Sequence, residues 1–239
     1  MEHGVAPGSA DDGFAWHGQE LQDCMAYSLL RRKKGGTFID LAANDWRIFS
    51  NSLSLERDHG WTGLCIEPNP VYHPGLLRYR TCDVVSAYVS ETEGFATFSA
   101  LPPRTASDSC KKVTPDMPVP HYCAGTEGKL VSNSTSRKVA TVTVWTSRFE
   151  QILARHRLPQ RIDFMSLDVN GPEEAVMRSF PFDRHNITVL AIEGPSHGLQ
   201  TLLSSQDYRL MCAVCRLDQL WVHWPSLQTD GASYAVDPA

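Results

Sequence analysis

Two stretches decide the fold, Thr37-Phe-Ile-Asp-Leu-Ala-Ala-Asn-Asp-Trp46 and Gly63-Leu-Cys-Ile-Glu-Pro-Asn-Pro70. Each begins with a short apolar run that ends on a carboxylate, Asp40 in the first stretch and Glu67 in the second. The segment between them, 47–60, is long enough for one helix. Together they predict a strand, a helix and a second parallel strand, with both strand ends presenting acidic groups to one crevice.

The same pattern recurs later in the chain. Apolar runs that end on an acid occur again at Ile162–Asp168 and Ile187–Glu193. Ligands of open α/β sheets bind just outside the carboxyl ends of the strands, so four acids in this position predict one ligand site. Two β segments, Tyr208–Val214 and Leu217–Trp224, follow in hairpin order. The chain is therefore predicted to be an α/β protein with a mostly parallel sheet and a C-terminal antiparallel hairpin.

Other elements follow from periodicity and turn residues. Residues 82–89 predict a third strand, and residues 95–99 predict its hairpin partner. Helical periodicity predicts helices at 17–34, 49–59, 74–79 and 147–157, and a further helix starting at Pro172.

The chain is expected to form one domain over residues 17–225. Residues 1–16 are expected to be a disordered tail, and residues 226–239 a C-terminal tail. Residues 101–136 are rich in Pro, Ser, Thr and Lys without periodicity. A structureless loop this long inside a compact domain is usually functional or disordered, so we interpret it as an insertion over the active-site face.

Composition excludes some partners. The 239 residues include 22 basic and 27 acidic side chains, so the net charge of −5 does not favour nucleic-acid binding. No stretch approaches the ~20 apolar residues that a membrane span needs. Residues 1–16 contain no apolar core typical of a secretory signal. Seven cysteines at scattered spacings argue against a disulfide framework and for a reducing compartment, so a cytoplasmic protein is expected.

The acids at the strand ends also indicate a type of cofactor. A carboxylate about 20 residues past the first strand–helix turn holds the ribose hydroxyls in open α/β sheets, and Glu67 stands 27 residues after Asp40 (67 − 40 = 27). The turn Leu41–Trp46 contains no glycine, whereas pyrophosphate cofactors need a glycine-rich turn at a helix N-terminus. S-adenosylmethionine carries both a ribose and positive charge, so the residues favour methyl transfer over NAD or FAD chemistry. A different nucleotide ligand or a ligand-free scaffold stays open, because a strand-end acid also often caps the following helix.

Several motifs together resemble a known family. They are Thr37–Asp45, Ser50–Ser52, Gly60–Asn69, Ile162–Gly171 and Ala191–Glu193, with the upstream Leu21–Asp23 and the closing Tyr208–Asp218 run. In order and spacing these resemble the FkbM-type S-adenosylmethionine-dependent methyltransferases. The likeness covers about residues 22–222.

The resemblance implies a seven-stranded Rossmann-like sheet and transfer of a methyl group, usually to an oxygen. The acceptor is then a small-molecule or carbohydrate hydroxyl. By this likeness Asp40 and the turn from Ala42 through Asn44 to Asp45 face the methionine part of the cofactor. The resemblance assigns the remaining cofactor contacts to Glu67 on the ribose, with Pro68 and Asn69 beside it, and to Ser86 and Ala87 near adenine.

The resemblance places Asp168 at the junction of cofactor and substrate and Glu193 near the acceptor. Either carboxylate is a candidate general base, since an alcohol acceptor must lose its proton. The chain departs from the family pattern at Ala42 and Trp46, where glycine is usual, and at Asn170, where a glutamate is usual. These departures leave a second hypothesis, a catalytically inactive Rossmann-like module that binds a cofactor or a partner. No metal site is predicted, although Asp168, Asn170 and Glu193 carry the oxygen ligands that Mg²⁺ prefers.

Overall fold

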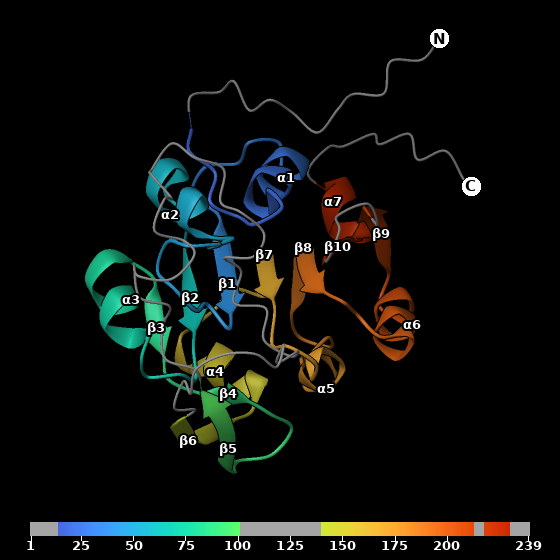
Figure 1. The fold of residues 1–239 in the computed structure, drawn as a ribbon. Helices are drawn as coiled ribbons and strands as arrows, with labels where there is room; N and C mark the ends of the chain where they lie inside the picture. The colour runs from blue at the N-terminus through green and yellow to red at the C-terminus, as the bar shows by residue number, and fades with distance from the viewer. Residues whose placement is uncertain (1–13, 101–139, 213–217, 230–239) are drawn as a thin grey trace, which may run out of the picture.

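The computed structural model describes residues 14–100, 140–212 and 218–229. Its main element is a seven-stranded sheet with helices on both faces (Figure 1). The strand order is β3-β2-β1-β7-β8-β10-β9. Strands β3, β2, β1, β7 and β8 run parallel, while β10 is antiparallel to both of its neighbours. The predicted fold class, mostly parallel with a C-terminal antiparallel hairpin, is confirmed.

The element bounds agree with the predicted order. The strands of the large sheet are β1 (Thr37–Leu41), β2 (Thr62–Ile66), β3 (Asp83–Val85), β7 (Arg161–Leu167), β8 (Asn186–Glu193), β9 (Tyr208–Cys212) and β10 (Asp218–His223). The helices are α1 (Gln22–Leu29), α2 (Leu53–His59), α3 (His73–Tyr79), α4 (Phe149–Arg155), α5 (Glu173–Arg178), α6 (His197–Ser205) and α7 (Trp224–Thr229). The sequence did not predict α6 and α7.

The sheet separates two apolar cores. Alternate residues of β1 point to opposite faces, so Ile39 joins one core and Phe38 the other. Helices α4, α5 and α6 cover the Ile39 face, while α1, α2, α3 and α7 contribute to the Phe38 face. Strand β7 is buried from Ile162 to Leu167, because a central parallel strand is covered on both sides.

The predicted ends of the domain differ from the structure. The expected boundary at residue 225 falls inside α7, where Leu227 is buried in the core. The expected N-terminal tail includes Phe14 and Trp16, whose rings contact His59 at centroid distances of 4.5 and 5.5 Å. The predicted insertion at 101–136 lies outside the described residues.

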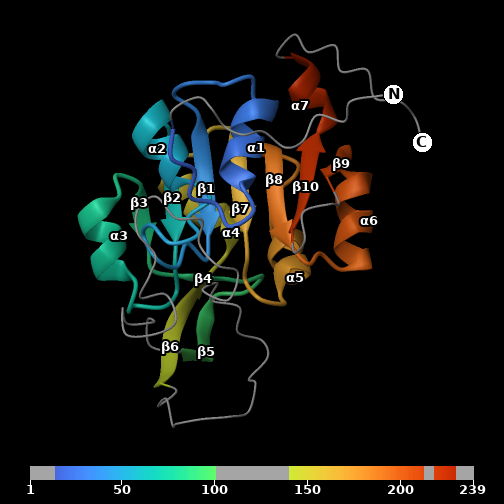
Figure 2. The same cartoon turned by 45° about the horizontal axis from the view of Figure 1, so that its top comes forward.

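The predicted hairpin between residues 82–89 and 95–99 is wrong. The first segment divides into β3, in the large sheet, and β4 (Tyr88–Val89), in a separate three-stranded sheet (Figure 2). There β6 (Ala140–Ser147) lies between β4 and β5 (Gly94–Ala100), parallel to the first and antiparallel to the second. Strand β5 forms seven residue pairs with β6, which provides a far longer ladder than the two-residue β4 could offer.

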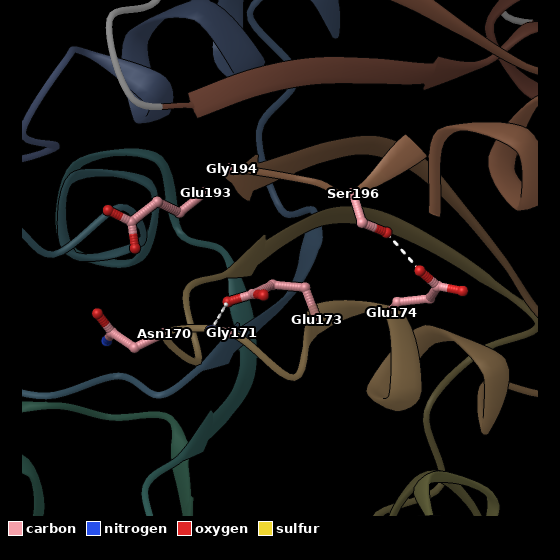
Figure 3. Close-up of a pocket in the computed structure, with 7 residues that line it drawn as sticks. All are labelled: Asn170, Gly171, Glu173, Glu174, Glu193, Gly194 and Ser196. Carbon is pink, nitrogen blue, oxygen red and sulfur yellow. Dashed lines mark hydrogen bonds between the residues drawn. The ribbon is translucent and has the colours of Figure 1, made fainter. Parts of the chain in front are cut away.

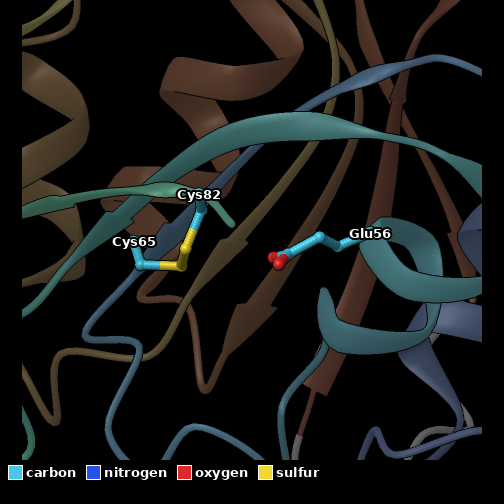
Figure 4. Close-up of side chains that lie close together, drawn as sticks. All are labelled: Glu56, Cys65 and Cys82. Atoms are coloured by element: carbon cyan, nitrogen blue, oxygen red, sulfur yellow. A yellow bond between two sulfur atoms is a disulfide. The ribbon is translucent and has the colours of Figure 1, made fainter. Parts of the chain in front are cut away.

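The expectation that cysteine usage argues against disulfides is also corrected. Cys65 on β2 and Cys82 just before β3 form a disulfide, with Cα atoms 6.0 Å apart (Figure 4). The cysteines are 17 residues apart in sequence, and the parallel pairing of β2 with β3 brings them together. Disulfides persist in oxidising compartments, so the cysteines no longer support a reducing one. In the described parts of the chain, no helix is long and apolar enough to cross a membrane.

Replacing Cys65 and Cys82 together by serine is expected to destabilise the protein by about 3 kcal/mol, because a disulfide that closes a short loop restricts the unfolded chain by roughly that amount. Thermal unfolding measures the change. Cys24→Ser is the control, since Cys24 does not belong to this disulfide, and should melt like the parent. A double variant that melts like the parent would show that the disulfide does not stabilise the fold.

Candidate active site

The four acids that end the apolar runs lie at one edge of the large sheet. Asp40 is next to last in β1, Glu67 and Asp168 directly follow β2 and β7, and Glu193 ends β8. These strands are parallel neighbours, so their carboxyl ends meet at the same edge. The edge therefore has the position of a ligand site in an open α/β sheet.

Glu67 is held by the backbone of two turns. Its Oε2 accepts the Asn44 N–H at 2.8 Å, and its Oε1 accepts the Asn69 N–H at 2.7 Å. Burial raises the pKa of Glu67 to about 7 against the effect of these two bonds, and the nearby Asp40 raises it further. A carboxylate has about four acceptor positions, so one on each oxygen is left for a pair of ligand hydroxyls.

The turn after β1 adopts the backbone of a glycine turn without containing glycine. Ala42 and Asn44 both have left-handed φ angles, 63° and 56°. The Ala42 and Ala43 N–H groups donate to the Ile66 carbonyl at 2.8 and 3.2 Å, which draws the turn toward Glu67. The left-handed conformation costs an ordinary residue about 1–2 kcal/mol, so the backbone contacts outweigh this cost.

Two residues of this turn are engaged in local structure. The Asp45 Oδ1 accepts the Arg47 and Ile48 N–H groups, each at 2.9 Å. The Trp46 ring lies 4.4 Å from that of Tyr79, and Gly75 passes close beneath it: a Cβ there would lie 2.9 Å from Trp46 Cδ1. Trp46 is therefore a packing residue between the turn and α3.

The other predicted cofactor contacts differ in accessibility. Asp40 is buried, and burial raises its pKa, while the charge of Arg80 and the hydroxyl of Ser52 oppose the rise. Asn69 is buried and its Oδ1 accepts the Val71 N–H at 3.2 Å, while Pro68 is half-buried. After β3, Ser86 is exposed and Ala87 is buried.

Asp168 and Glu193 form a carboxyl pair. Loss of surrounding water and a hydrogen bond with the Glu193 side chain both raise the pKa of Asp168. The Asp168 side chain is exposed on the crevice, and the Glu193 carboxyl beside it opposes its ionisation. Two carboxyl groups this close cannot both ionise easily, and the pair therefore tends to hold one proton between them.

Sequence reasoning missed a third acid, Asp218. It opposes Glu193 across the β8–β10 ladder and accepts a hydrogen bond from the Gln22 side chain. Burial raises the pKa of Asp218 to about 6; Gln22 opposes the rise, and Glu193 adds to it. Strand β10 runs antiparallel to β8, so its first residues lie beside the last residues of β8. An acid at the predicted start of the last strand could therefore have been assigned to this edge.

A pocket opens at the ends of β7 and β8, with a volume of about 430 Å³ (Figure 3). Its lining residues are Asn170, Gly171, Glu173, Glu174, Glu193, Gly194 and Ser196. The Glu173 Oε1 accepts the Gly171 N–H at 2.8 Å, and Glu174 is bound by Arg178 and Ser196. Figure 3 shows the side chains of Asn170 and Glu193 extending to the same side, away from the Glu174–Ser196 pair.

The carboxyl edge does not offer a metal cluster among the described residues. Among all the described residues, the one group whose ligand atoms lie close enough to hold a metal consists of Glu56, Cys65 and Cys82. Its two sulfur atoms are bonded to each other, and the Glu56 carboxylate is already bound by Arg80 and Thr81 (Figure 4). This group is therefore a disulfide beside a buried ion pair.

A mostly parallel seven-stranded sheet with acids at its carboxyl edge defines an α/β domain of the Rossmann-like class. Residues 23–210 match the methyltransferase FkbM domain. The chain thus belongs to the FkbM methyltransferase family, as its motifs predicted. No curated protein sequence gives a significant match. One similar solved structure is the precorrin-6y C5,15-methyltransferase of Geobacter metallireducens GS-15, with 14% identity, a TM-score of 0.41, and coverage of 89% of this chain and 93% of that one.

Ala42→Gly is expected to leave stability unchanged or raise it by about 1 kcal/mol, because glycine adopts a positive φ without a steric cost. Ala43→Gly is the matched control and should destabilise the protein, since Ala43 is buried and is not among the positive-φ residues. Chemical denaturation compares the two variants. If both lose stability equally, the left-handed turn is not a source of strain.

Stability is expected to fall as the pH rises from about 5 to about 8, because acids whose pKa is raised on folding bind more protons in the folded state. Glu67 and Asp218, with folded-state pKa values of about 7 and 6, contribute this way. Their contribution is complete below the pKa of the unfolded chain and is lost as the pH passes the folded value. Thermal unfolding at several pH values measures the slope, and Glu67→Gln should flatten it. A slope of opposite sign would contradict the buried carboxyl assignment.

Proposed function

We propose that this chain is an S-adenosylmethionine-dependent methyltransferase that methylates a hydroxyl oxygen of a small molecule or carbohydrate. The observation that carries the proposal is the Asp168–Glu193 carboxyl pair beside a pocket, at the same sheet edge as Glu67. Cofactor use, acceptor chemistry and residue roles are parts of this proposal.

The residues fit this cofactor better than a pyrophosphate one. Glu67 retains acceptor positions suited to the two ribose hydroxyls. In the turn after β1, the N–H groups of Ala42, Ala43 and Asn44 all donate to protein oxygens. These donors are therefore not available to bind a phosphate group. Buried acids at this edge favour a ligand with positive charge, since an uncompensated charge in a protein interior is costly. S-adenosylmethionine, when bound, supplies a methyl group already activated by its sulfonium.

The pocket fits a neutral acceptor. Of the described residues that line it, none is basic, and Glu193 is acidic and accessible. A phosphate or carboxylate on the acceptor would meet repulsion there, whereas hydroxyl groups find acceptors on Glu193 and Asn170. This supports a polyhydroxylated or otherwise neutral small molecule.

The chain's contribution to catalysis is positioning and proton transfer. Methyl transfer is an in-line displacement, so holding the acceptor oxygen in line supplies much of the rate. The proton of the acceptor hydroxyl passes to the ionised carboxylate of the Asp168–Glu193 pair as the new C–O bond forms. A base with a raised pKa is stronger than an ordinary carboxylate, which suits abstraction from an alcohol.

A second candidate is a non-catalytic cofactor-fold module. Asn170, where the family usually has a glutamate, lines the pocket and supports this alternative. Thermal-shift titration tests cofactor binding, because a ligand that binds only the folded state stabilises it by RT ln(1 + [L]/Kd). Stabilisation by S-adenosylmethionine and S-adenosylhomocysteine supports cofactor use, which an inactive cofactor-binding module would share, and turnover with labelled methyl donor then supports the first proposal. No response, or a response to NAD instead, would contradict it.

Asp168→Asn is expected to lower turnover by about 10²–10⁴-fold, the range that a general base contributes, while the thermal shift with cofactor persists. Turnover is measured with labelled methyl donor on acceptors found by screening hydroxylated compounds. Wild-type turnover should rise with pH, because the raised pKa of Asp168 means that its ionised, proton-accepting form becomes common only at higher pH. Asp183→Asn, an exposed loop acid beside Arg184, is the control. Full activity of Asp168→Asn would remove Asp168 from the mechanism.

A further inference from the structure

A buried arginine lies behind the proposed cofactor site. The Arg80 side chain is fully inaccessible and follows α3 directly. Its Nε donates to Glu56 Oε2 at 2.8 Å, its Nη1 to Ser50 Oγ at 3.0 Å and its Nη2 to Ser52 Oγ at 2.8 Å. A guanidinium with this many fixed bonds is rigid, and it is always charged.

The network continues from Arg80 to Asp40. The Ser52 hydroxyl accepts from Arg80 and donates to Asp40 Oδ2. The hydroxyl of Ser50 interacts with the same carboxyl group. Arg80, Ser52 and Asp40 thus form a continuous chain from α3 to the carboxyl end of β1. Each link in this chain is a direct hydrogen bond.

The charges of this network do not cancel. Arg80 carries one positive charge, and Glu56 already compensates it through a 2.8 Å ion pair. The charged groups that act on Asp40 are Arg80 and Glu56, and Asp40 in turn acts on Glu67. An ionised Asp40 therefore leaves an excess negative charge at the carboxyl edge, which a cationic ligand would offset.

The disulfide explains why Arg80 stays in place. Only Thr81 separates Arg80 from Cys82, which is bonded to Cys65 on β2. Thr81 donates its N–H and its hydroxyl to Glu56 Oε1, the hydroxyl at 2.9 Å. The Arg80 guanidinium also lies 5.9 Å from the centre of the Phe38 ring on β1. Both ends of the network are thereby fixed to the central sheet.

We infer that Arg80 is a positioning residue that, through the hydroxyl of Ser52, keeps Asp40 oriented and makes it easier to ionise when a cationic cofactor binds. This inference rests on the proposed function. It gives Arg80, Ser52 and Asp40 one joint role, which the family match does not assign to them. Arg80 does not itself contact the cofactor in this account.

The test is the pH dependence of S-adenosylmethionine binding, measured by calorimetry on the full chain. Ser52→Ala removes the Ser52 link between Arg80 and Asp40 but leaves the Ser50 contact and the Arg80–Glu56 pair. We expect affinity to fall about tenfold near neutral pH, as for the loss of a hydrogen bond to a charged group. The pH below which affinity is lost should also move upward, because Asp40 then ionises less readily. Ser204→Ala, which removes an exposed hydroxyl that donates to the Gln200 carbonyl in α6, outside the network, is the matched control and should leave the profile unchanged.

Two Arg80 variants extend the test, with thermal unfolding confirming that each is folded. Arg80→Gln should shift the binding profile upward in pH more than Arg80→Lys, which keeps the positive charge. An affinity loss in Ser52→Ala that is equal at every pH would indicate a merely structural role and overturn the inference. An unchanged Ser52→Ala profile would overturn it too, and wild-type binding would still support the proposed function. Absence of binding by the wild type would overturn both.

Discussion

Burial of carboxylates at the ends of parallel strands is the constraint on which the rest of this structure depends. Asp40 and Glu67 are each only 4% exposed. Such groups are tolerated where other polar groups bind them, and here Glu67 takes two backbone N–H groups while Asp40 takes a serine hydroxyl. The left-handed turn at Ala42 follows from this need, because it brings the Asn44 N–H to Glu67.

The same constraint connects the fold to the proposed chemistry. Acids that have lost their water bind protons more tightly, which raises the pKa of Glu67 and Asp218, while the neighbouring Glu193 carboxyl raises that of Asp168. A cation entering the edge would reverse this effect by favouring the ionised forms. In the proposed enzyme, cofactor binding therefore favours the ionised form of the Asp168–Glu193 pair, which can accept the proton of the acceptor hydroxyl. Before the cofactor binds, the protonated form is favoured.

The sequence predicted those parts of the site that depend on local pattern. An apolar run ending on an acid identifies both a buried strand and the side chain at its carboxyl end, which is why β1, β2, β7 and β8 and their acids were found. Contacts between distant segments left no such signal. The order β4-β6-β5, the Cys65–Cys82 disulfide and the reach of Arg80 toward Asp40 depend on how strands pair in space. The absence of glycine at Ala42 was visible, but only the structure shows that alanine adopts the glycine conformation there.

The central claim is that buried, proton-retaining carboxylates receive a cationic cofactor, and proton release on binding tests it most directly. Calorimetric titration near neutral pH, in buffers of different ionisation enthalpy, counts the protons released. The account predicts that S-adenosylmethionine binds with net proton release. It also predicts smaller release with S-adenosylhomocysteine, which lacks the sulfonium charge. Binding of both compounds without proton release, or with equal release, would contradict it.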